Sequence, residues 1–158
     1  MKRAGFAMIV LLCLSVTVYA QDGNPFIPGK IAYIGTDFNV YTLSGETRTT
    51  LTDDAGLDGD RVRYYQFPTW ATDGRLAYFE GELTAQRQIT TEIFVSVDGL
   101  VAGESVYEGA DESFTYAYWS PRSCGADCFD LAVLLSSAQQ NGFLVNVIRD
   151  SASEPNVT

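Results

Sequence analysis

The chain has 158 residues, a formal net charge of −10 and no histidine. A surface this acidic repels phosphate backbones and no basic stripe offsets it, so nucleic acid is excluded as a partner. Without histidine, this chain alone cannot build a Ser-His-Asp or Cys-His catalytic arrangement. A hydrophobic content of 46% is too high for a disordered protein, so we expect a folded domain.

The first 20 residues have the pattern of a secretory signal peptide. Lys2 and Arg3 give a short positive segment, residues 6–18 form an apolar run, and Val18 and Ala20 lie where a signal peptidase requires small residues. The run is shorter than the ~20 residues of a membrane span. We therefore expect cleavage after Ala20, export to the periplasm or the extracellular space, and no stable membrane span in the mature chain. A retained anchor is the alternative.

Residues 21–158 are predicted to be all-β, because Gly-containing turns separate short strands and no long segment has helical periodicity. Three segments repeat the same order of strands and turns, at about 29–52, 66–107 and 114–158. Matching strands recur about 45–50 residues apart, which is the spacing of propeller-blade repeats. In chain order, the predicted strands are 29–34, 39–43, 49–52, 67–70, 75–79, 92–97, 105–107, 116–119, 130–135 and 142–148.

The connections between these strands are predicted to divide between two faces of the blades. Tight turns at Ser44-Gly45, Asp73-Gly74 and Asp98-Gly99 fall on one face. Long irregular connections fall on the opposite face, which we expect to bind ligands because loops on a rigid scaffold commonly do so. These connections are 52–66, 80–92, 108–113 and 137–142.

The richest of these connections, residues 53–65, supplies the candidate binding residues, which are Asp58, Asp60, Arg61, Arg63, Tyr64 and Tyr65. Its carboxylates would suit Ca²⁺, but their spacing matches a calcium loop poorly, so we favour a solvated acidic turn and predict no metal. The arginines and tyrosines would grip an acidic or aromatic group of a peptide. The alternative is that the tyrosines pack between blades.

Cys124 and Cys128 are the only cysteines after residue 20. In an oxidising compartment this spacing predicts a structural disulfide that closes a small loop. A metal site would need further ligands, and the chain has neither histidine nor a third mature cysteine to supply them.

One motif gives the repeats a family resemblance. The segment Pro68-Thr69-Trp70-Ala71-Thr72-Asp73-Gly74 leads into the strand Leu76-Ala77-Tyr78, and a strand with Ile93-Phe94 then ends near Asp98-Gly99. This order resembles the TolB-type β-propeller repeat, and Trp119-Ser120-Pro121 resembles the start of another copy. The resemblance implies antiparallel four-stranded blades.

About 2.5–3 blades are expected, fewer than the ~4–8 of a closed ring. Three explanations are open: a longer reading frame, a ring closed by copies of the chain, or a small sandwich that only resembles blades. Self-association through open blade edges is expected in the second case.

The function predicted from the sequence is that of an exported, non-catalytic binding or scaffolding module of TolB-like propeller type. It is expected to engage a protein or peptide through the face that carries the long connections. No cofactor motif or catalytic constellation is found, so we predict that the chain is not an enzyme and needs no cofactor. The alternative is the propeller portion of a prolyl-oligopeptidase-like serine hydrolase whose catalytic domain lies outside this chain.

Overall fold

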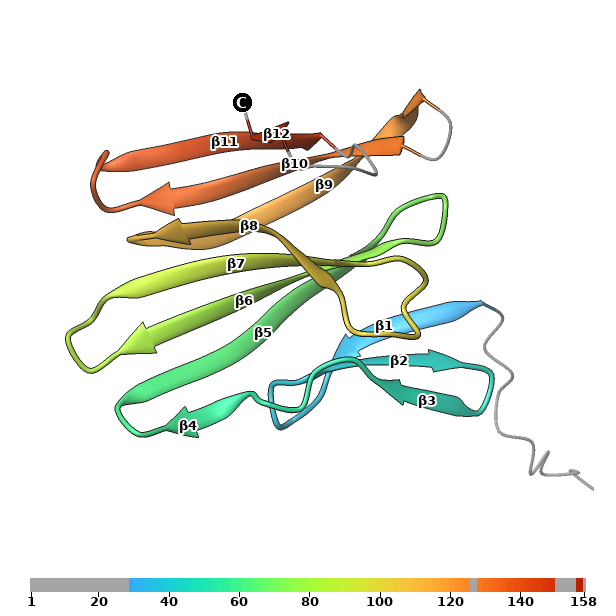
Figure 1. Ribbon diagram of the computed structural model, residues 1–158, viewed down its shortest axis with the longest axis horizontal. Coiled ribbons are helices and arrows are strands. Elements are labelled where there is room, and N and C mark those ends of the chain that lie inside the picture. Colours follow the sequence, from blue (N-terminus) through green and yellow to red (C-terminus); the bar gives the residue numbers. More distant parts are fainter. Residues whose placement is uncertain (1–28, 126–127, 150–155, 158) are drawn as a thin grey trace, which may run out of the picture.

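The computed structural model describes residues 29–125, 128–149 and 156–157, so the predicted signal peptide lies outside the described residues. The described chain is all-β, with strands in three antiparallel sheets and no helix within those ranges (Figure 1). In this part of the chain, accordingly, no helix has the length and apolar character needed to cross a membrane.

The first sheet, sheet A, has three strands in the order β1-β2-β3. They are β1 (Lys30–Ile34), β2 (Val40–Ser44) and β3 (Thr47–Thr50). A tight turn at Gly45, whose φ is +58°, joins β2 to β3, as the Ser44-Gly45 pair predicts.

The second sheet, sheet B, has five strands in sequential order. They are β4 (Gly56–Asp58), β5 (Arg61–Trp70), β6 (Leu76–Thr84), β7 (Ile89–Ser96) and β8 (Glu104–Ala110). A bulge between Gln66 and Thr69 shifts the register of β5 against β6. The turn from β5 to β6 is closed by hydrogen bonds between the backbones of Ala71, Gly74 and Arg75, around the predicted Asp-Gly pair.

The third sheet, sheet C, has the order β12-β11-β10-β9. Its strands are β9 (Glu112–Gly125), β10 (Cys128–Ser137), β11 (Gly142–Arg149) and β12 (Asn156–Val157). The predicted disulfide between Cys124 and Cys128 stays a prediction, because the side chains of residues 123–129 lie outside the described part of the structure.

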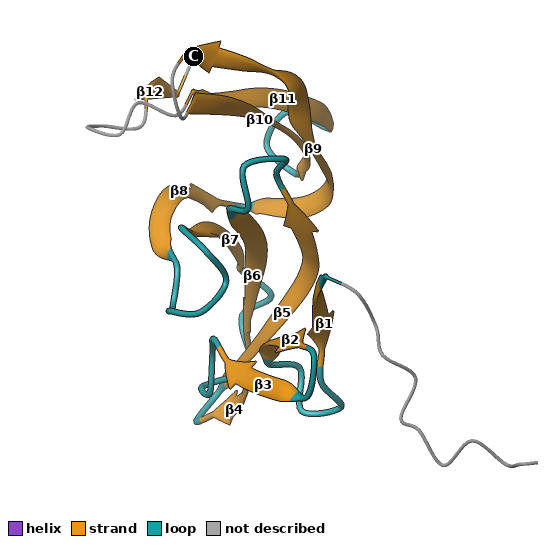
Figure 2. Cartoon of the chain, turned by 90° about the vertical axis from the view of Figure 1, so that its right-hand side faces the viewer, coloured by secondary structure: helices purple, strands orange, loops and turns teal. Residues whose placement is uncertain are grey.

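Sheet B is the middle layer of a stack of the three sheets (Figures 1 and 2). Its strand β6 shows this best, because consecutive residues from Leu76 to Gly81 are all buried. Side chains alternate between the faces of a strand, so burial of consecutive residues requires cover on both faces.

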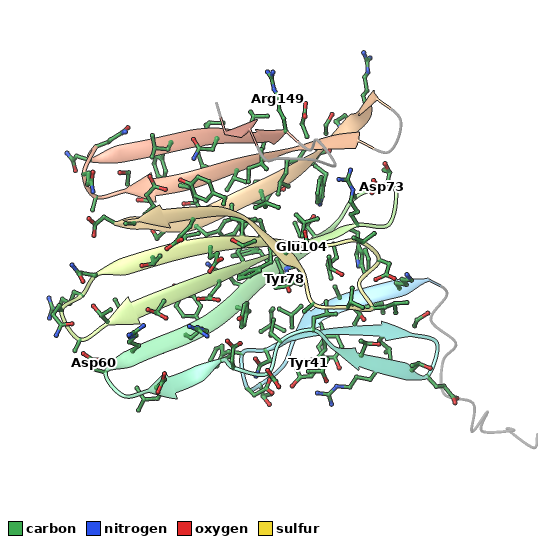
Figure 3. The ribbon with its side chains drawn as sticks, viewed as in Figure 1. Tyr41, Asp60, Asp73, Tyr78, Glu104 and Arg149 are labelled. Atoms are coloured by element: carbon green, nitrogen blue, oxygen red, sulfur yellow. The ribbon has the colours of Figure 1, made fainter. Side chains whose placement is uncertain are left out.

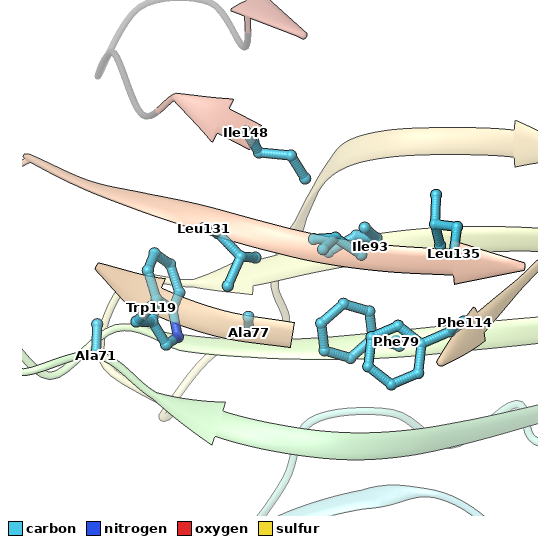
Figure 4. Packing of buried hydrophobic residues seen from close by; sticks show 10 residues of the cluster. Ala71, Ala77, Phe79, Ile93, Phe114, Trp119, Leu131, Leu135 and Ile148 are labelled. Atoms are coloured by element: carbon cyan, nitrogen blue, oxygen red, sulfur yellow. The ribbon is translucent and has the colours of Figure 1, made fainter. Parts of the chain in front are cut away.

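The face of sheet B toward sheet C packs into the larger of two cores. Phe79 is fully buried there and stacks on Phe114 with ring centroids 3.8 Å apart (Figure 4). Trp119 closes one end of this core, and its indole Nε1 donates a hydrogen bond to the Thr69 carbonyl at 3.1 Å. The buried members are Ala71, Ala77, Phe79, Ile93, Phe114, Trp119, Leu131, Val133, Leu135 and Ile148.

The face of sheet B toward sheet A packs into the smaller core, formed by Val40, Leu51, Tyr65, Leu76 and Tyr78. A buried hydrogen bond adds to it, because the Thr42 hydroxyl donates to the Gly99 carbonyl at 2.7 Å. Sheets A and B are thus joined by both apolar contact and a specific polar contact.

Three of the four irregular connections predicted from the sequence are wrong over most of their length, whereas the fourth, 137–142, contains a turn at residues 138–141 between β10 and β11. Residues 52–66 contain β4 and the start of β5, and residues 80–92 contain the end of β6 and the start of β7. Residues 108–113 are almost entirely strand as well, with only Asp111 between β8 and β9. These segments are polar, yet their backbones continue the ladder, since Glu80 pairs with Glu92 and Leu83 with Ile89.

Candidate functional site

The candidate residues of segment 53–65 lie on the hairpin formed by β4 and β5, and the structure divides them into three groups. Arg63 and Tyr65 lie on the face of sheet B toward sheet A. Tyr64 lies on the opposite face, where its ring covers Gly81. Asp58, Asp60 and Arg61 lie at the exposed end of the hairpin, where Figure 3 labels Asp60.

The register of β5 and β6 builds a charged cluster around Arg63 and Tyr65. Arg63 is the cross-strand partner of Glu82, and Tyr65 is the partner of Glu80. Asp54, from the segment after β3, completes the cluster. Directly opposed residues on two antiparallel strands are close enough for their side chains to bond.

The cluster is internally paired. The Tyr65 hydroxyl lies 2.8 Å from Asp54 Oδ1 and 3.1 Å from Glu80 Oε2. Arg63 Nε lies 3.2 Å from Glu80 Oε1, and Arg63 Nη2 lies 3.2 Å from Glu82 Oε2. Arg63 Nη1 donates to Asp54 as well. All three nitrogens of the guanidinium therefore face carboxylates of the same chain.

The pKa values of this cluster follow from burial and charge. Burial raises the pKa of Glu80 above its usual value, and the nearby Arg63 charge offsets this only in part. Burial also acts to raise the pKa of Asp54, but hydrogen bonds from Tyr65 and Arg63 outweigh it and lower that pKa. For Tyr65, burial and the two carboxylates act together and raise the pKa of the phenol. The phenol therefore stays protonated and donates its hydrogen bond at neutral pH.

The arrangement suits a structural role for Arg63 and Tyr65. Tyr65 is buried in the core between sheets A and B, where its ring meets Tyr78 edge-on with centroids 5.9 Å apart. Arg63 holds Asp54 of the preceding segment against sheet B. Their proposed grip on a peptide stays a prediction, and it would require these contacts to break.

The other predicted residues are more accessible but are not gathered into a site. Arg61 is exposed and lies 3.5 Å from Glu82 through Nη1 and Oε1. Asp58 is the cross-strand partner of Arg61, and Asp60 lies in the turn next to Gly59. Among the described residues, no group of three or more His, Cys, Asp or Glu side chains is arranged to hold a metal ion.

Sequence reasoning missed a second surface, the outward side of sheet C. Four large side chains there are exposed, by 55% for Tyr116, 58% for Tyr118, 68% for Phe143 and 66% for Val145. The strand pairings put Tyr118, Ala132 and Val147 in one row and Tyr116, Leu134 and Val145 in the next. We call these seven residues the outer face of sheet C: Tyr116, Tyr118, Ala132, Leu134, Phe143, Val145 and Val147.

A signal for this face was present in the sequence. Residues 131–135 of β10 are Leu-Ala-Val-Leu-Leu, without a polar residue on either face of the strand. A strand of this kind is typical of a sheet covered on both sides. In the structure, Leu131, Val133 and Leu135 are covered by sheet B, whereas Ala132 and Leu134 remain partly exposed.

No family model, curated protein or solved structure matches this chain.

Proposed function

We propose that the chain is an exported, non-catalytic binding or scaffolding module built from TolB-like propeller blades, and that it engages a protein through the outer face of sheet C. The signal-peptide pattern of residues 1–20 supports export. The face-to-face stacking of consecutive antiparallel sheets supports the blade assignment, because blades of a propeller stack in chain order.

The observation that carries the proposal is the exposure of the outer face of sheet C at the end of the stack. The opposite face of the same sheet is buried against sheet B. Within this molecule, an apolar face of sheet C is therefore covered by another β-sheet. Contiguous exposed apolar patches on soluble proteins commonly mark interaction sites. Because the patch is uncharged and lies on the face of a sheet, it fits the surface of another protein, and in particular another β-sheet.

Site-specific photo-cross-linking in cells that express the full chain tests this function. A photoreactive phenylalanine analogue replaces Tyr118 or Phe143 on the outer face of sheet C, and Leu57 on the exposed strand β4 serves as the control. The proposal predicts a discrete protein adduct from Tyr118 and Phe143 and none from Leu57. Equal labelling at all three positions, or none at the two face positions, would contradict it.

A further inference from the structure

The outer face of sheet C has the properties of an interface between two copies of this chain, and this inference rests on the proposed function. We infer that the protein forms a two-fold symmetric dimer through that face, in which β9 of one copy lies over β11 of the other. Area, charge and the order of side chains on the face each support the second copy as the occupant.

The exposed area reaches the lower limit for a specific interface between two copies. With a full side-chain area of roughly 150–250 Å² for an aromatic residue, the exposed parts of Tyr116, Tyr118, Phe143 and Val145 amount to about 450 Å² per copy. Two copies would bury about 900 Å² from these side chains, and Ala132, Leu134 and Val147 would bring the total past the minimum of ~1,000 Å² for a specific interface.

Charge restricts where two copies can meet. The chain has a formal net charge of −10, so most pairs of surfaces would bring carboxylates together. From the row of Tyr118, Ala132 and Val147 to the row of Ser136 and Phe143, every outward residue of β9, β10 and β11 is uncharged. Within these rows, two copies can therefore approach without placing like charges opposite each other.

The order of side chains across the face is complementary to itself. The tyrosines lie on β9 at one side, the two valines lie on β11 at the other, and β10 runs between them. A two-fold axis parallel to β10 and midway between the facing sheets places Tyr116 of one copy over Val145 of the other. The same operation repeats the contact in reverse, as a closed dimer requires. Aromatic rings then pack on branched aliphatic side chains, with sheets ~10 Å apart.

Sedimentation velocity over a dilution series, on mature protein recovered after expression of the full chain, tests the inference. Wild type is expected to sediment as a dimer that dissociates on dilution. Because each substitution occurs twice in a symmetric interface and buries an unpaired charge, Tyr116→Lys or Val145→Glu should raise the dimer dissociation constant by about 100-fold or more. The matched control, Val97→Glu, changes a valine that is 72% exposed in the connection between β7 and β8 and should leave the dimer intact.

Mixing the two single variants tests the arrangement itself and also controls for folding. Tyr116→Lys in one copy and Val145→Glu in the other would bring opposite charges together once per dimer, so the mixture should form heterodimers that neither variant forms alone. Monomeric wild type at every concentration, a dimer insensitive to Val145→Glu, or no heterodimer in the mixture would each overturn the inference. In the photo-cross-linking experiment, adducts of Tyr118 and Phe143 with a different protein would reject the dimer but support the proposed function. If neither position forms an adduct, both the dimer and the proposed function are rejected.

Discussion

Replacing Phe79 by alanine tests the packing of sheet B against sheet C. Phe79 is on β6, is fully buried and stacks on Phe114 of β9. Phe67 offers a matched control, because it also contacts Phe114, with ring centroids 5.2 Å apart, but is 54% exposed. The two changes delete the same atoms beside the same aromatic partner and differ in how much of the ring is buried.

The expected magnitudes differ severalfold. Phe79→Ala loses the transfer free energy of a fully buried ring and leaves a cavity, and together these lower the free energy of unfolding by about 3–5 kcal/mol. Phe67→Ala removes a ring that already contacts water over half its surface, so about 1 kcal/mol is expected. For a domain of this size, the difference corresponds to a fall in Tm of roughly 10–15 °C.

Urea denaturation at one protein concentration, followed by tryptophan fluorescence, measures both changes. Trp119 lies in the same core as Phe79 and reports on the contact between the two sheets. If Phe79→Ala costs no more than Phe67→Ala, the two sheets are not packed as described.

Three further changes test local features. Gly99→Ala would place a Cβ against the Trp70 ring at a φ of +68° and should lower the free energy of unfolding by about 2–4 kcal/mol. Gly45→Ala, at a φ of +58° with open space around it, should lower it by only about 1 kcal/mol in the same urea denaturation experiments. Because burial raises the pKa of Glu80, the native state binds its proton more tightly than the unfolded state does. The stability of wild type relative to Glu80→Gln should therefore fall as the pH rises above 4.5. A rise over that range, measured by urea denaturation, would mean that Glu80 is not buried. Arg87 is exposed and has a φ of +63° in the turn between β6 and β7. In urea denaturation, Arg87→Gly should raise the free energy of unfolding by about 0.5–1 kcal/mol, whereas Arg87→Ala should leave it unchanged.

The sequence predicted the apolar centres of the strands and several turns, because those follow from local patterns. The apolar run that begins at Leu76-Ala77-Tyr78 and the Asp73-Gly74 pair place β6 and the turn before it correctly. Their polar extensions were missed, since polar side chains do not prevent a backbone from continuing a ladder. Residues 80–84 are an example: they are in β6, and all of them pair with the start of β7 except Thr84 at the end.

The charged cluster depends on register, which local patterns do not determine. Arg63 and Tyr65 were identified as candidates, but their partners Glu80 and Glu82 were not. The bulge between Gln66 and Thr69 sets which residues of β6 face them. Pro68, which has no backbone N–H to donate to the ladder, marks an irregularity there but does not determine the register on either side of it. The outer face of sheet C was missed for a different reason, because the expectation of open blade edges did not indicate which sheet face is exposed or which side chains lie on it.

Hydrogen exchange along β6, followed residue by residue, tests most directly whether sheet B is the interior layer of a three-sheet stack. The amides of Leu76 to Glu80 should be among the slowest in the protein and should exchange only through global unfolding, while those of the exposed strand β4 should exchange through local opening. If β6 exchanges as fast as β4, sheet B is not covered on both faces, and the end of the stack proposed as the binding surface does not exist.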